Sequence, residues 1–193
     1  MNTVSQIKSL IAAFTLGASI LIITPAVAQS TSEAQSAASL SVVMEFLANT
    51  SPDKVEAAAK RLVAPNATYI SLNFDNPELK KILPWTGTNK GPEAFSYTFS
   101  QVANYWDIED FTVTTKIASG EDVAIFGSFT YRSVAVGNVF TSPFSIHAKV
   151  RDEKITYFQF MEDTYASTSS FRQSGSWTVK TTKDTASFKV GKK

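Results

Sequence analysis

The hydrophobic positions of this chain follow two different spacings. In the first half, apolar residues return every three to four positions, as on one side of an α-helix; Phe95, Phe99 and Val102 are an example. In the second half, apolar and polar residues alternate, as along a β-strand with one buried face. With Pro, Gly and Asn residues marking the ends, these spacings predict helices near 40–47, 51–64 and 91–106, and strands at 66–72, 111–117, 123–132, 140–150 and 155–162.

Helices that precede a series of antiparallel strands are typical of an α+β fold. The aromatic side of the third helix requires a broad partner, so we expect three N-terminal helices packed in a strongly curved, mainly antiparallel sheet. The last strand ends on an acidic pair, Glu162 and Asp163. Because alternate strand residues point the same way, Phe158, Phe160 and Glu162 are predicted to share one face.

The two ends of the chain differ in composition from the middle. An apolar run over 10–23 and the small residues of Ala26-Val27-Ala28 are typical of a secretory signal peptide, with predicted cleavage after Ala28. We therefore expect a periplasmic or secreted protein that has no membrane anchor once the signal is removed. The predicted divisions are a signal peptide at 1–28, a flexible tether at 29–39, one domain at 40–175, and a C-terminal extension at 176–193 with an edge strand and a disordered end.

Composition excludes several classes of function. The chain has 18 basic and 17 acidic residues, and removal of Lys8 with the signal peptide balances the charges, so no footprint for nucleic acid or an anionic membrane is present. The absence of cysteine excludes disulfides and thiol catalysis. With a single histidine and no clustered carboxylates, we expect no metal site, and nothing in the sequence indicates a cofactor.

The order of these elements resembles the NTF2-like superfamily, in particular its SnoaL-like and ketosteroid-isomerase-like branch. The resemblance is carried by the segments 62–69, 85–95, 150–155 and 162–165. It implies a cone-shaped α+β domain that encloses a small-molecule cavity, often in a homodimer. Members of the superfamily include isomerases, polyketide cyclases, epoxide hydrolases and dehydratases, while others only bind or assemble, so the fold leaves the function open.

The catalytic acids of that branch are missing from their expected positions. The resemblance places the base of ketosteroid isomerases at Ser71, their oxyanion-stabilising acid near Ile146, and the final-strand acid of SnoaL-like enzymes at Phe160. None of these side chains is an acid. Glu162 is the nearest acid on the cavity side, either as a general acid or base with a raised pKa, or as a carboxylate at the rim paired with a cation.

His147 is a second candidate for general-base catalysis. Strand parity argues for another role, because Phe144, Ile146 and Val150 form the apolar face and His147 lies on the other. On that outer face we expect a homodimer contact.

Aromatic and hydroxyl side chains are predicted to line the cavity and bind its ligand. These residues are Tyr69, Ser71, Trp85, Tyr97, Trp106, Tyr131, Phe158 and Phe160. Because acids are scarce among them, the sequence favours an exported protein that binds a small, largely apolar molecule. Two alternatives stay open: an isomerase, cyclase or hydratase that uses Glu162, and a homodimeric interaction module.

Overall fold

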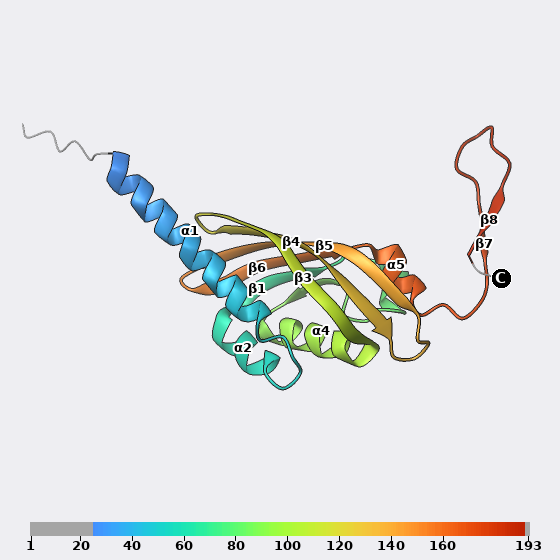
Figure 1. Ribbon diagram of the computed structural model, residues 1–193, viewed down its shortest axis with the longest axis horizontal. Coiled ribbons are helices and arrows are strands. Elements are labelled where there is room, and N and C mark those ends of the chain that lie inside the picture. Colours follow the sequence, from blue (N-terminus) through green and yellow to red (C-terminus); the bar gives the residue numbers. More distant parts are fainter. Residues whose placement is uncertain (1–24, 192–193) are drawn as a thin grey trace, which may run out of the picture.

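The computed structural model describes residues 25–191, and within them a six-stranded sheet curls around the helices (Figure 1). This confirms the predicted α+β class and the curved, mainly antiparallel sheet. Most of the predicted signal peptide lies outside the described residues. The elements are α1 (Pro25–Leu47), α2 (Val55–Leu62), β1 (Val63–Ser71), α3 (Pro77–Lys80), β2 (Gly87–Lys90), α4 (Pro92–Tyr105), β3 (Trp106–Ser119), β4 (Asp122–Ser133), β5 (Val139–Arg151), β6 (Lys154–Glu162), α5 (Thr164–Ser169), β7 (Trp177–Val179) and β8 (Phe188–Val190).

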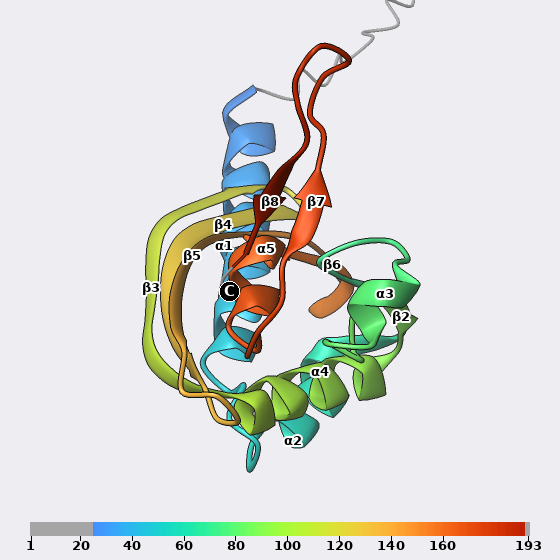
Figure 2. The ribbon, with the colours of Figure 1, turned by 90° about the vertical axis from the view of Figure 1, so that its right-hand side faces the viewer.

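The main sheet has the strand order β2-β1-β6-β5-β4-β3, and every pair is antiparallel except β1 with β6. Figure 2 looks into the curve and shows α4 and α2 across its open side. The bend has local causes in β3 and β4. Register shifts leave Glu109 and Thr114 of β3 with no residue directly opposite them in the backbone pairing with β4, and such bulges increase strand twist. At Gly127 of β4, a side chain would overlap the Thr112 carbonyl oxygen and the Phe144 ring, so only glycine permits this close approach.

An aromatic cluster joins the helices to the sheet. Phe46 of α1 and Phe95 of α4 meet edge to face with ring centres 5.4 Å apart, and Tyr69 of β1 stacks on Phe95 at 4.8 Å. Phe158 of β6 completes the cluster, 5.4 Å from Tyr69. All four side chains are buried. The apolar side of the third predicted helix, which is α4, is thus covered by aromatic residues of the sheet and of α1.

Several of the predicted element boundaries were wrong. Trp106, expected at the end of the third helix, is extended and begins β3, where it pairs with Ser133. Sheet pairing outweighs the helical spacing at this position, since the Val134 N–H also donates to the Tyr105 carbonyl oxygen. The segment 73–88, to which the spacing assigned no helix or strand, contains α3 and the start of β2.

The segments outside the cone also differ from the expected arrangement. Residues 29–39, expected as a flexible tether, lie within α1, whose Ser39 hydroxyl donates to the Gly120 carbonyl oxygen at 2.7 Å. The C-terminal extension does not add a strand to the main sheet. Its β7 pairs with β8 in a separate hairpin that projects from the body of the protein (Figure 1). Among residues 25–191, no helix combines the length and apolar character needed to cross a membrane.

Candidate functional site

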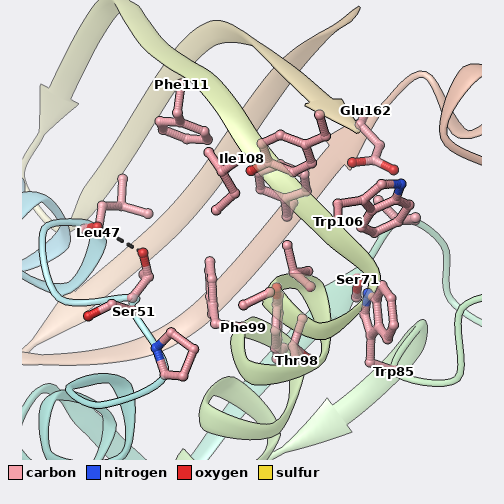
Figure 3. A pocket seen from close by; sticks show the side chains of 18 of the residues that line it. Leu47, Ser51, Ser71, Trp85, Thr98, Phe99, Trp106, Ile108, Phe111 and Glu162 are labelled. Carbon is pink, nitrogen blue, oxygen red and sulfur yellow. Dashed lines mark hydrogen bonds between the residues drawn. The ribbon is translucent and has the colours of Figure 1, made fainter. Parts of the chain in front are cut away.

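A cavity of about 410 Å³ lies between the concave face of the sheet, α4 and the loop between α1 and α2 (Figure 3). Its walls are mainly apolar and aromatic, with hydroxyl groups and one carboxyl group. The residues that line it are Leu47, Ala48, Thr50, Ser51, Pro52, Tyr69, Ser71, Leu72, Trp85, Thr98, Phe99, Val102, Ala103, Trp106, Ile108, Phe111, Tyr131, Phe160 and Glu162.

Glu162 is held at the inner wall because it ends β6 on the concave side. It lies opposite Phe144 of β5, and the strand alternation directs its carboxylate into the cavity (Figure 3). The adjacent Asp163 has a different role. Its side chain accepts a hydrogen bond from the Ala166 N–H at 3.0 Å and caps α5, while its own N–H donates to the Ser142 hydroxyl at 2.8 Å. The acidic pair is therefore divided between a helix cap and the cavity.

The surroundings of Glu162 change its acidity. Burial raises its pKa to about 7, since little water reaches the ionised form; the Ser167 hydroxyl partly offsets this rise and the charge of Asp163 adds to it. Burial, with a smaller contribution from the Glu162 charge, also raises the pKa of Tyr131 and of Tyr69 above the ordinary range. Near neutral pH, Glu162 can therefore gain or lose a proton, while both phenols stay protonated and can donate hydrogen bonds.

The aromatic wall beside Glu162 is fixed from outside the cavity by α5. The Trp106 indole N–H donates to the Ser170 hydroxyl at 2.9 Å, and that hydroxyl donates to the Ser167 carbonyl oxygen at 2.6 Å. Trp85 packs edge to face against Trp106, with ring centres 5.8 Å apart. Buried indole N–H groups require a partner, so this chain of hydrogen bonds holds one orientation of the Trp106 ring.

The end of β1 forms the floor of the same region. Ser71 lies beside Phe160 in the parallel β1–β6 pairing, so two of the three positions that the resemblance assigns to missing acids are neighbours. The next residue, Leu72, has a φ of 63°, which is uncommon for a residue other than glycine. Its N–H donates to the Phe160 carbonyl oxygen at 2.9 Å. This contact ends the strand at the cavity.

The structure brings together most of the side chains that the sequence nominates. Tyr69, Ser71, Trp85, Trp106, Tyr131, Phe160 and Glu162 all line the cavity. Tyr97 instead lies on the outer side of α4 with 49% of its surface exposed, and Phe158 lies in the core with 0% exposed. Neither of these two is part of the lining.

His147 lies on the convex face of the sheet. Its Nε2 is 2.8 Å from Asp122 Oδ1, and the Lys149 ammonium is 2.9 Å from the same oxygen. The homodimer contact predicted for this face stays a prediction. Among residues 25–191, no three side chains of the His, Cys, Asp and Glu types are grouped as metal ligands.

Sequence reasoning missed the wall formed by the loop between α1 and α2. Ser51 and Pro52 were interpreted as the beginning of the second helix, whereas α2 begins at Val55 and both residues line the cavity. It also missed Ile108 and Phe111 of β3, which are partly exposed and belong to the lining.

Comparison with known proteins identifies the family. No family model matches the chain. Patulin synthesis protein F of Aspergillus clavatus is 45% identical over 126 residues, covering 64% of each chain. Patulin biosynthesis cluster protein F of Penicillium expansum is 41% identical over 134 residues, covering 68% of this chain and 67% of that protein. This chain belongs to the patulin synthesis protein F family. It spans a little less than two thirds of the Aspergillus member.

Solved structures show the fold of this family member. An NTF2-like protein from Burkholderia xenovorans aligns with a TM-score of 0.58 and 20% identity, over 68% of this chain and 93% of that one. A putative SnoaL-like polyketide cyclase from Jannaschia aligns with a TM-score of 0.56 and 12% identity, over 72% and 95%. The fold is therefore NTF2-like, of the SnoaL-like type, as the order of elements predicts.

Proposed function

We propose that this protein is an enzyme in the synthesis of a small metabolite, and that Glu162 moves a proton on a substrate held in the cavity. One observation carries the proposal. A carboxyl group with a pKa of about 7 faces a mainly apolar cavity whose hydroxyl groups include those of two protonated tyrosines. A general acid or base works best when its pKa is near the working pH. The relatives, which are named for patulin synthesis, support a role in such a pathway.

The chemistry that suits this arrangement is an isomerisation or ring closure next to a carbonyl group. Ionised Glu162 takes a proton from the carbon beside the carbonyl, and the electron pair moves onto the carbonyl oxygen. A hydroxyl group of Tyr131 or Tyr69 donates a hydrogen bond to that oxygen as its charge grows. Protonated Glu162 then returns the proton to a different atom of the same molecule, so no other reactant is consumed.

The remaining lining residues supply binding. Trp85, Trp106 and Phe160 offer flat apolar surfaces on which a small ring can pack, as pockets for small molecules commonly do. Binding of a small, largely apolar molecule is thus the first step of the proposed reaction. Binding without turnover is the competing function, and the two differ in whether Glu162 changes the bound molecule.

Turnover by the purified protein decides between these functions. Enones, epoxides and polyketide-like compounds are incubated with the protein and followed by proton NMR in deuterated buffer, which detects both rearrangement and exchange of hydrogen for deuterium. We expect one of these classes to react, and Glu162→Gln to lower kcat by at least about 100-fold, the usual contribution of general acid–base catalysis. Asp122→Asn makes the same charge change on the convex face and is expected to retain the activity.

An active protein whose kcat is unchanged by Glu162→Gln would reject the proposed role of this residue. If small molecules bind but none is altered, the protein is a binding protein. Mass spectrometry of molecules that co-purify with it would then identify the ligand class directly.

A further inference from the structure

The cavity has an unbalanced set of charges. Among its described lining residues, Glu162 is the one acid, and none is Lys, Arg or His. Apart from the two indoles, the other polar side chains of the lining are hydroxyls, namely those of Thr50, Ser51, Tyr69, Ser71, Thr98 and Tyr131. The Thr50 and Thr98 hydroxyls already donate to the Leu47 and Ala94 carbonyl oxygens. The other hydroxyl groups can donate to carbonyl and ether oxygens of a ligand without adding charge.

Two arginines of the neighbouring strands form ion pairs with acids outside the lining. Arg132 of β4 forms an ion pair with Glu109 at 2.6 Å. Arg151 of β5 is bound through two nitrogens to Glu121, at 2.9 and 2.8 Å, on the convex side. No basic side chain of the lining is thus available to neutralise a second negative charge inside the cavity.

A ligand anion in this cavity would lie close to the Glu162 carboxylate. Two like charges in a site with few water molecules repel each other strongly, because the effective dielectric constant is far below that of water. An uncharged ligand of the same shape avoids this repulsion and keeps the hydrogen bonds from the hydroxyl groups.

We propose that the cavity selects its substrate by charge: it accepts an uncharged molecule that carries carbonyl or hydroxyl oxygens, and it rejects carboxylates and phosphate esters. The inference rests on the proposed function, since it concerns the same site and names the class of substrate. It is tested by binding alone, so that it stands or falls separately from catalysis.

Three probes of nearly the same shape test the selection. These are 2-naphthamide, which is uncharged, 2-naphthoate, which is an anion, and 2-naphthylmethylammonium, which is a cation. Isothermal titration calorimetry at pH 8 measures the binding of each to the full chain, to Glu162→Gln and to Glu56→Gln. Glu56 lies on the exposed side of α2 and pairs with Lys60, so its substitution controls for the change in net charge.

We expect 2-naphthamide to bind at least about tenfold more tightly than 2-naphthoate to the unmodified protein and to the Glu56→Gln control. In Glu162→Gln the difference is expected to fall below about twofold. It is also expected to shrink at pH 5.5, where Glu162 is protonated while 2-naphthoate is still ionised, because an ordinary carboxyl group titrates near pH 4.

Equal binding of amide and carboxylate at pH 8 would overturn the inference, as would a difference that persists in Glu162→Gln. Tighter binding of the ammonium probe than of the amide would overturn the preference for an uncharged ligand, and so would failure of the amide to bind. Turnover without charge selection would leave the proposed function intact. Charge selection without turnover would support this inference and count against catalysis.

Discussion

Each face of the curved sheet holds an acid whose pKa departs from its ordinary value, and the departures have opposite signs. On the concave face, Glu162 lies in the apolar cavity, and burial raises its pKa to about 7. On the convex face, Asp122 is half exposed and accepts hydrogen bonds from His147 and Lys149, which lower its pKa. Both groups are carboxylates of one sheet, Asp122 on β4 and Glu162 on β6.

The difference shows that position on the sheet decides which acid can be reactive. Asp122 has the partners usually associated with catalysis, a histidine and a lysine, yet those partners hold it in its ionised form on an open surface. Glu162 lacks such partners and therefore keeps a proton that it can exchange near neutral pH. The absence of cations around an acid is the more informative feature in this molecule.

The largest expected effect is on the free energy of unfolding of Glu162→Gln, which we expect to depend on pH. The pKa of Glu162 is raised on folding, from about 4.5 to about 7, so its contribution is fully present below pH 4.5 and is lost as the pH rises through 7. We expect Glu162→Gln, which is always uncharged, to be more stable than the unmodified protein at pH 8 by up to about 3 kcal/mol. At pH 4.5 the two should be nearly equal.

Urea denaturation between pH 4.5 and 8 measures this prediction. Asp122→Asn is the control, because it removes a carboxylate whose pKa is not raised on folding. Parallel stability curves for the unmodified protein and Glu162→Gln across this pH range would show that Glu162 is well solvated, and would remove the basis for its proposed role.

A smaller effect concerns the support of the concave wall. Ser170→Ala removes the acceptor for the buried Trp106 indole N–H and is expected to cost about 1–3 kcal/mol of folding free energy, the usual penalty for an unpaired buried polar group. Ser169→Ala, at the preceding residue, which ends α5 and is half-buried, is the matched control. Equal stability of the two variants, measured by urea denaturation at pH 7, would show that α5 does not fix the Trp106 ring.

Alternation along the strands predicted which face of the sheet each candidate catalytic residue occupies. It assigned Glu162 to the concave side and His147 to the convex side, because a strand has only two faces and one of them must be apolar. Alternation carries no information on depth. Phe158 and Phe160 share a face, but Phe158 is covered by Phe46 and Phe95 while Phe160 is left at the cavity.

Structural features that depend on contacts between distant segments could not be predicted from the sequence. Trp106 continues a helical spacing, and only its pairing with Ser133, 27 positions later, makes it a strand residue. The cavity wall at Ser51 and Pro52 is made by a turn whose composition also suits the beginning of a helix. Pairing of β7 with β8, in place of an edge of the main sheet, likewise depends on the tertiary arrangement.

The smallest expected effect is on the convex face. The pKa of Asp122 is lowered on folding, so its contribution to stability is present above its ordinary pKa of 3.8 and is lost as the pH falls through the lowered value. Because the group is half exposed, we expect Asp122→Asn to cost less than about 1 kcal/mol at pH 7 and to cost less than that at pH 3. Urea denaturation at the two pH values measures this. A loss of several kcal/mol at pH 7 would mean that the convex face is covered in solution, since only a group shielded from water contributes that much. The opposite pKa shifts of the two acids would then follow from their different partners, because both acids would be shielded from water.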